Sequence, residues 1–351
     1  MTVKHRTPPR SAWFLHARRW RAAFTLKGFL LVAALAATAC ASTPAPPACV
    51  LPESDRAWVD RALEAWRFAS REITGIGPVP NVQVVLFSAD CVLRSANAFS
   101  SPNAQGVTWI ASPHSGTIAL PDGSEIPSGV TSYASGKEGQ RYFVMSTPTV
   151  WQAAGVGEGA ALQRTMVAVM LHEGSHVAQI GPYGPRLGAL IEANHLPDSF
   201  NDDALQGHYK TNEEFTASIQ RETQLFLEAT AEKDDAVARS TAREARRLMR
   251  ERQKRWQVGE DAYWVEAEDL WLTFEGAGQW TGYQWQIHPR GGAQPAEEVL
   301  ARFTKGRWWS QTEGFAVVMA LDRLAGPRWK NHAFGDGAKT VLEMLDEALA
   351  E

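Results

Sequence analysis

Two histidines and a glutamate in the stretch His172-Glu173-Gly174-Ser175-His176 are the residues of this chain best placed to do chemistry. Residues four apart lie on one face of a helix, so both imidazoles can reach a single metal ion. Glu173 can take a proton from a metal-bound water, whose pKa zinc lowers to roughly 7. The spacing therefore predicts one zinc ion per chain, with His172 and His176 as ligands and Glu173 as general base.

The surroundings of this motif predict a long buried helix. Residues 161–180 are mostly apolar, and only uncharged residues flank the histidines, as expected for a helix that crosses the core with its polar edge in a cleft. Gly181-Pro182 is expected to end it. Gly174 costs about 1 kcal/mol relative to alanine, so it is expected to mark a close approach of another element. The alternative, a chance HExxH on a surface helix, is disfavoured by the apolar flanks.

A catalytic zinc ion needs a third protein ligand and one open position. Pro182 stands where the metzincin peptidases have a third histidine, which excludes that class. Two later apolar segments carry Glu-Gly pairs, at Glu275 and at Glu313, and both glutamates are candidates for the third ligand. Glu222 is a further candidate, although its charged surroundings favour a surface ion pair.

The HExxH motif and the Glu-Gly segment at 269–278 together resemble the gluzincin metallopeptidases, loosely over residues 156–285. The resemblance implies Glu275 as the third ligand, because it follows a Trp-Leu pair and comes first in the chain. The segment from Glu313 to Ala316 matches the glutamate motif of aminopeptidase-type gluzincins more literally. Glu313 therefore stays open as the ligand, or as a carboxylate that orients a ligand histidine.

The same resemblance implies a peptide-binding strand and further catalytic groups. Gly276 and Gly278 are expected to let the glutamate helix pack closely on the motif helix. Residues 141–145 are expected to form an edge strand above that helix which pairs with an extended peptide, or which binds nothing. Tyr283 and His288 are candidates to stabilise the oxyanion of a tetrahedral intermediate, although such residues more often pack or cap.

Residues 1–39 have the pattern of an export signal. The first 27 residues carry seven lysines and arginines and no acid, and residues 28–39 are apolar but too short to span a bilayer comfortably. The run ends at Cys40, which follows either a plain cleavage site or, as we favour, a lipobox that marks Cys40 for acylation. Residues 40–53 are then a lipid anchor and tether. Ala41 after the cysteine resembles lipoproteins of the outer membrane, so the expected location is the periplasm at that membrane.

Two further cysteines, Cys49 and Cys91, form an even pair in an oxidising compartment. We predict a disulfide between them, which would join the start of the mature domain to the end of a strand that begins near Val82. Two separate thiols are the alternative.

Composition restricts the class of partner. The chain has 35 lysines and arginines, and seven of them lie in the predicted signal. Without the signal, 28 basic side chains remain against 39 acidic ones, so the net charge of the mature chain is −11 with histidine neutral. Such a balance implies no nucleic-acid partner. Membrane contact is expected through the lipid anchor only, and the sequence does not predict the oligomeric state.

The periodicity of the sequence predicts an α+β fold in a single zincin-like domain over residues 54–350. A small, mainly antiparallel sheet with one helix is expected at 54–154. A larger helical part is expected at 155–350, with an antiparallel, charged helical insertion at about 205–258 whose outer faces are solvated. The expected elements are a helix at 54–74 that buries Trp58, Leu63 and Trp66, a strand at 82–87, and later helices near 260–286, 296–303, 309–324 and 339–349.

These features predict an exported, lipid-anchored zinc metallopeptidase acting on peptide or protein substrates. The competing hypothesis is a non-catalytic, zinc-binding envelope lipoprotein that binds peptide or peptidoglycan. Glu173 argues against that hypothesis, because a scaffold has no need for a base beside the metal.

Overall fold

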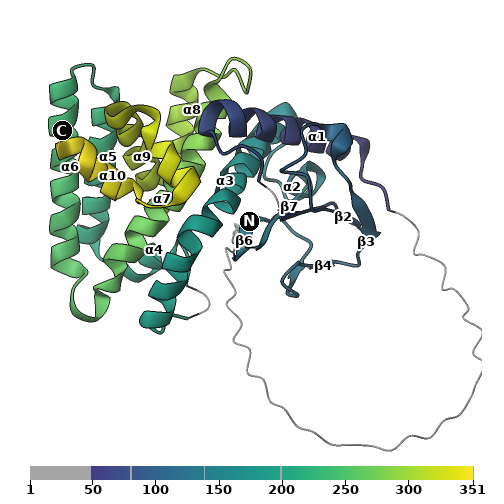
Figure 1. Ribbon diagram of the computed structural model, residues 1–351, viewed down its shortest axis with the longest axis horizontal. Coiled ribbons are helices and arrows are strands. Elements are labelled where there is room, and N and C mark those ends of the chain that lie inside the picture. The colour runs from purple at the N-terminus through teal and green to yellow at the C-terminus, as the bar shows by residue number, and fades with distance from the viewer. Residues whose placement is uncertain (1–48, 80, 138, 198–199, 351) are drawn as a thin grey trace, which may run out of the picture.

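The computed structural model describes residues 49–79, 81–137, 139–197 and 200–350 (Figure 1). The predicted export signal, the lipidation site at Cys40 and most of the tether lie outside the described residues. The fold is α+β as predicted, with a small and mostly antiparallel sheet near the N-terminus and a larger helical part. Within the described residues, no helix is both long and apolar enough to cross a membrane.

The N-terminal helix packs its aromatic face inward as expected. Helix α1 (Glu53–Phe68) buries Trp58, Leu63 and Trp66 and continues into a π-helical turn, η1 (Ala69–Thr74). The predicted disulfide between Cys49 and Cys91 is present. Cys91 begins the second strand rather than ending the first, so the bond joins the segment before α1 to the start of β2.

The main sheet has five strands in the order β3-β2-β1-β7-β6, and a separate hairpin pairs β4 with β5. Strand β1 coincides with the predicted strand, and its pairing with β7 is the single parallel one among the described strands of the main sheet. The strands are β1 (Val82–Phe87), β2 (Cys91–Ser95), β3 (Ile110–Pro113), β4 (Thr117–Ala119), β5 (Glu125–Pro127), β6 (Ser132–Lys137) and β7 (Gln140–Ser146).

The prediction that residues 141–145 form an edge strand is wrong. Strand β7 is there, but it lies between β1 and β6 and both of its edges are hydrogen-bonded. The edge strand on this side of the sheet is β6, because β6 precedes β7 as its antiparallel hairpin partner and pairs with the outer side of β7. The backbone groups of Ser132, Ala134 and Gly136 alternate with those bonded to β7 and therefore point away from it.

The motif helix α3 (Gly159–Ala193) is 35 residues long, so the prediction that Gly181-Pro182 ends it is wrong. A proline inside a helix costs about 3 kcal/mol, because it removes one hydrogen bond and crowds the preceding turn. The residues beyond Pro182 offset this cost by burying Tyr183 and Leu187 against aromatic side chains of a later helix. Arg141 also donates to the carbonyl of Val177 at 3.1 Å, close to the interrupted turn.

Of the remaining helices, the last six confirm the predicted order with ends shifted by a few residues, and two short ones were not predicted. They are α2 (Pro148–Ala153), α4 (Ala204–Tyr209), α5 (Glu213–Ala231), α6 (Asp235–Trp256), α7 (Tyr263–Ile287), α8 (Ala296–Phe303), α9 (Trp309–Ala325) and α10 (Val341–Ala350), with short helical turns η2 (Ala104–Gly106), η3 (Gly259–Asp261), η4 (Gly326–Trp329) and η5 (His332–Asp336). One apolar core joins the inner face of the sheet to α1, α3, α7 and α9.

The charged pair α5 and α6 packs one face on the bundle and has exposed residues along the other, in line with the solvated faces that were predicted. Helix α5 packs along α9, and the two charged helices stand beside the rest of the bundle (Figure 1). Helix α6 buries a stripe of small and apolar residues that continues into Arg252, which is 1 % exposed. The prediction of a surface ion pair at Glu222 is therefore wrong, since Glu222 is fully buried against that guanidinium.

Candidate metal centre

Helices α3 and α7 bring the two motif histidines and Glu275 together. The Nε2 atoms of His172 and His176 lie 2.8 Å apart. Each Nε2 also lies 3.3 Å from an oxygen of the Glu275 carboxylate, Oε2 for His172 and Oε1 for His176. Tetrahedral zinc with bonds of about 2.0–2.2 Å holds its ligand atoms about 3.3–3.5 Å apart. The carboxylate distances therefore fit one shared metal ion, and the two nitrogens need to separate slightly.

Burial and charge at this group suit a cation. His172 is 6 % exposed, His176 4 % and Glu275 2 %. Burial lowers the pKa of His172, which favours the neutral imidazole that a metal needs as ligand. Burial alone would raise the pKa of Glu275, but the adjacent His172 and His176 hold it below its ordinary value. Oε2 of Glu275 accepts no hydrogen bond from the described residues.

Close packing fixes the orientation of the ligand helix. A Cβ on Gly174 would come within 2.4 Å of the Trp66 ring, which explains the predicted close approach at this glycine. A Cβ on Gly278 would lie 2.8 Å from Nδ1 of His172, so α7 contacts the motif helix there as expected. Gly276 instead faces the backbone of Gly314 on α9, contrary to the expectation that it contacts the motif helix.

The orientation of His176 depends on a residue that the sequence argument missed. Gln179 lies one turn further along α3, fully buried, with Oε1 3.3 Å from Nδ1 of His176. Its Nε2 donates to the carbonyl of Thr273 on α7 at 3.2 Å. An amide held in this way keeps the imidazole turned with Nε2 toward Glu275. Its signal in the sequence was a polar residue three positions after a ligand in an otherwise apolar helix.

Glu173 is held from the edge strand of the sheet. The Ser132 hydroxyl donates to Oε1 at 3.1 Å, and the outward N–H of Ala134 also bonds the carboxylate. Oε2 accepts no hydrogen bond from the described residues. Burial, followed by the charge of Glu275, raises the pKa of Glu173 well above its ordinary value. Glu173 therefore has a strong tendency to hold a proton, and a nearby cation would reduce it.

Two aspartates before α4 also approach this group, and the sequence argument missed both. Asp202 is 4 % exposed, and burial followed by the charge of Glu275 raises its pKa well above the ordinary value. The same causes raise the pKa of Asp203 to about 6. The centre therefore has two further carboxylates with raised pKa values nearby, and the charge of Arg307 opposes the shift at Asp203.

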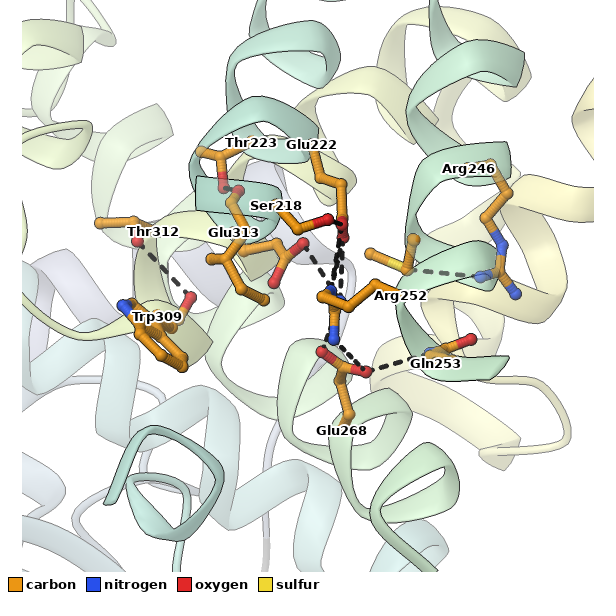
Figure 2. A network of polar contacts seen from close by, with 12 residues as sticks. Ser218, Glu222, Thr223, Arg246, Arg252, Gln253, Glu268, Trp309, Thr312 and Glu313 are labelled. Atoms are coloured by element: carbon orange, nitrogen blue, oxygen red, sulfur yellow. Dashed lines mark hydrogen bonds and ion pairs between the residues drawn. The ribbon is translucent and has the colours of Figure 1, made fainter. Parts of the chain in front are cut away.

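The other predicted glutamates meet at a different place. Glu222 on α5, Glu268 on α7 and Glu313 on α9 point toward the guanidinium of Arg252 (Figure 2). Glu313 lies 3.8 Å from Arg252, and no described contact joins it to either motif histidine. Glu222 accepts from Arg252 at 2.9 Å and from Ser218 at 2.7 Å. Neither glutamate is placed as a ligand of the His172 and His176 group.

The two proposed oxyanion donors are not brought to the centre by any described contact. Tyr283 lies eight residues after Glu275, about 12 Å further along α7. Its ring packs against Phe303 and Phe315 in the apolar core. His288 follows the end of α7, where its ring packs on Phe68 and its Nδ1 accepts the N–H of Arg290. Both residues have packing or capping contacts.

Among the described residues, the buried group His172, Glu173 and His176 has ligand atoms within 4.8 Å of one another and could hold a metal ion. Glu275 also reaches both imidazoles, so two carboxylates compete for the role of ligand. Glu275 spans the two Nε2 atoms, whereas Glu173 is bonded to β6, and this difference favours Glu275. Comparisons with protein-family models, with curated proteins and with solved structures find no match to this chain.

Proposed function

We propose that this protein is a zinc-dependent peptidase of gluzincin type. The observation that carries the proposal is that His172, His176 and Glu275 converge from two helices while Glu173 lies beside them without being needed as a ligand. Two imidazoles and a carboxylate suit zinc, and the same donors also occur around ferrous iron. Zinc is favoured because a glutamate next to the first histidine is what hydrolysis requires and what oxygen chemistry does not.

In this proposal the bound zinc supplies a Lewis acid that makes water acidic near neutral pH and polarises the scissile carbonyl. Glu173 takes the proton of the attacking water and returns it to the leaving amine. Its Oε2 is the oxygen for this transfer, because Oε1 is occupied by the Ser132 hydroxyl. Gln179 and Gly278 keep the imidazoles in place while the proton moves.

The edge strand β6, rather than β7, is our candidate for the substrate-binding strand. Its outward backbone groups face the side on which Glu173 lies, as the N–H of Ala134 shows by bonding that carboxylate. An extended peptide that pairs with β6 would therefore pass close to the base. The four residues of the centre are at most 6 % exposed. Such restricted access favours short or extended peptides over folded proteins.

We further propose that the chain is exported and anchored through Cys40. The disulfide between Cys49 and Cys91 supports an oxidising compartment, where such bonds persist. Incorporation of labelled palmitate into the full-length chain, abolished by Cys40→Ala, tests the anchor. A chain that is cleaved and released without label would reject it.

The decisive experiment on activity is Glu173→Gln in the purified protein, assayed with a library of extended peptides. The variant should keep its zinc and lose turnover by about 10²–10⁴-fold, because only proton transfer is removed. Glu192→Gln, an exposed position near the other end of α3, is the matched control and should change neither property. Full turnover in Glu173→Gln would reject the mechanism. Bound zinc with no hydrolysis by the unmutated chain would favour the non-catalytic binding lipoprotein.

A further inference from the structure

Three buried carboxylates share one buried cation in the Arg252 cluster, which consists of Arg252, Glu222, Glu268 and Glu313. The three glutamates are each at most 2 % exposed, and Arg252 is 1 % exposed. Figure 2 shows the carboxylates reaching the guanidinium from α5, α7 and α9. An ionised carboxylate is costly to bury without a compensating charge, and neighbouring carboxylates disfavour each other's ionised forms. At least one of the three should therefore carry a proton in the folded chain.

Two of the three carboxylates have the hydrogen bonds that an anion needs. Glu222 accepts from Nε and Nη2 of Arg252 at 3.0 and 2.9 Å, and from the Ser218 hydroxyl at 2.7 Å. Glu268 accepts from Nη1 of Arg252 at 3.2 Å, and from two glutamine side chains at the end of α6. Hydrogen bonds donated by N–H and O–H groups favour the ionised form of a carboxylate. Glu222 and Glu268 are therefore suited to stay ionised.

Glu313 has far fewer partners of this kind. It lies 3.8 Å from Arg252, and its Oε1 accepts no hydrogen bond from the described residues. A side-chain hydrogen bond joins its carboxyl group to that of Glu222. Two ionised carboxylates have no donor between them, so one member of this pair must be protonated. The contacts select Glu313 as the donor, because Glu222 is already held as an anion by the guanidinium.

The charges around Glu313 agree with this selection. Burial raises the pKa of Glu313 well above its ordinary value, and Glu222 and Glu268 act in the same direction, against the charge of Arg252. Glu313 also lines a small cavity whose other described charged residues are Asp202 and Glu268. Among the described side chains, Glu313 thus faces one cation and three acids.

The position of Glu313 connects the cluster to the candidate metal centre. Gly314 follows it on α9, and a Cβ on Gly276 of α7 would come within 2.3 Å of the Gly314 carbonyl oxygen. Gly276 in turn follows Glu275, so the two glutamates stand on either side of one close contact between helices. A change in the charge of Glu313 would therefore act on the packing of the helix that carries Glu275.

We propose that the Arg252 cluster is a pH-sensitive switch, in which Glu313 keeps a proton in the folded chain and donates a hydrogen bond to Glu222. The proton holds α9 against α5. As the pH rises, this proton passes to solvent and leaves two ionised carboxylates facing each other in the interior, so the contact between α5 and α9 weakens. The switch does not depend on peptidase activity.

The test compares the unmutated full-length protein with Glu313→Gln by urea unfolding between about pH 5 and 9. Glutamine keeps a hydrogen-bond donor at this position but cannot ionise. The folded unmutated chain retains a proton that the unfolded chain loses above about pH 4.3, so its unfolding equilibrium constant should rise relative to that of the variant, by up to tenfold per pH unit. Glu297→Gln, at an exposed position on α8, is the control and should give a constant ratio.

Glu222→Gln identifies which carboxylate holds the proton. It removes an anion that Arg252 binds, so the unfolding equilibrium constant should rise by about 10²-fold or more at every pH in the range. A mild effect of Glu222→Gln together with a severe effect or failed folding of Glu313→Gln would overturn the proposal. A ratio between the unmutated protein and Glu313→Gln that does not change with pH would also overturn it.

Hydrogen exchange distinguishes a switch from a uniform change in stability. At about pH 8, amides of α5 and α9 should exchange faster in the unmutated chain than in Glu313→Gln, whereas those of β1 should differ less between the two chains. Both chains are measured at one pH, so their intrinsic exchange rates match. Equal protection of α5 and α9 in the two chains would overturn the switch.

Discussion

The imidazole of His172 lies directly against the backbone of Gly278. A Cβ at that position would be 2.8 Å from Nδ1 and 3.0 Å from both Cγ and Cε1. The ring of a candidate metal ligand thus packs against the backbone of α7, and the same helix supplies Glu275 one turn earlier. A change in the separation of α3 and α7 would therefore change the geometry of the candidate metal centre.

Gly278→Ala tests this dependence. The added methyl group cannot be relieved by a flexible side chain, because its contacts are a rigid ring, so α7 or His172 must move. We expect a loss of about 1–3 kcal/mol in the free energy of unfolding from overpacking. We also expect a loss of about 10–100-fold in metal affinity from the displaced ligand. Urea unfolding and competition with a zinc chelator measure the two effects.

Gly188→Ala on α3 is the matched control. Nothing lies within 4 Å of a Cβ at that position. Alanine should therefore be neutral or stabilising by about 0.5–1 kcal/mol, with metal affinity unchanged. Unchanged metal binding in Gly278→Ala would show that His172 does not depend on this contact.

The ligand set can be determined by elemental analysis of purified variants. We expect one zinc per chain in the unmutated protein, and loss of zinc in His172→Ala and in Glu275→Ala, because each removes one of three donors. Glu313→Ala should retain it, since Glu313 faces Arg252. Zinc that survives Glu275→Ala but not Glu313→Ala would reassign the third ligand.

Local spacing explains what the sequence could predict. Two histidines four apart share a helix face whatever surrounds them, and Glu275 stands on an apolar helix that had to pack on the core. The long helix α3 was predicted but its end was not. The cost of Pro182 is local, whereas the burial of Tyr183 and Leu187 that offsets it depends on a helix far along the chain.

Contacts between distant segments explain what was missed. Ser132 lies 41 positions before Glu173, and no pattern in either segment predicts the hydrogen bond between them. The burial of Arg252 could have been predicted from the sequence. This residue continues a stripe with spacings of three and four, formed by Ala238, Ala242, Ala245 and Met249. That stripe marks a buried face, so its last member should have been expected inside despite its charge.

Arg252→Met should be among the most destabilising changes in the helical part. It leaves Glu222 and Glu268 buried without the guanidinium to which both are hydrogen-bonded. Breaking a buried ion pair from one side costs about 3–5 kcal/mol. Arg247→Met on the same helix removes contacts to Glu244 and Glu251 from a side chain that is 51 % exposed, and it should have little effect. Similar urea midpoints for the two variants would contradict a structural role for the Arg252 cluster.

The disulfide should contribute measurably to stability. Cys49 and Cys91 are 42 positions apart, and cross-linking a loop of that size restricts the unfolded chain. Its removal should cost about 2–4 kcal/mol. The unfolding temperature should fall in reductant for the unmutated protein, and a Cys49→Ser, Cys91→Ser double variant should be lower and insensitive to reductant. A double variant as stable as the oxidised protein would show that the cross-link constrains nothing.

Asp269 should make stability depend on pH between about 4 and 6. Burial raises its pKa to about 6, against the opposing hydrogen bond from the Thr340 hydroxyl at 2.7 Å. The folded chain then keeps this proton at pH values where the unfolded chain has lost it. The stabilisation is fully present below the unfolded pKa and is lost as pH rises through about 6, with a size of at most roughly 3 kcal/mol.

The measurement is the difference in unfolding free energy between the unmutated protein and Asp269→Asn, taken at pH 4, 5, 6 and 7. Subtraction removes the contributions of other titrating groups. As the pH rises, the unmutated protein should lose unfolding free energy relative to Asp269→Asn, because asparagine has no carboxylate to ionise in the interior. Thr340→Val should steepen the trend by removing the hydrogen bond that favours the ionised carboxylate. A difference that is constant across this range would mean that the Asp269 carboxylate is solvated in the folded protein.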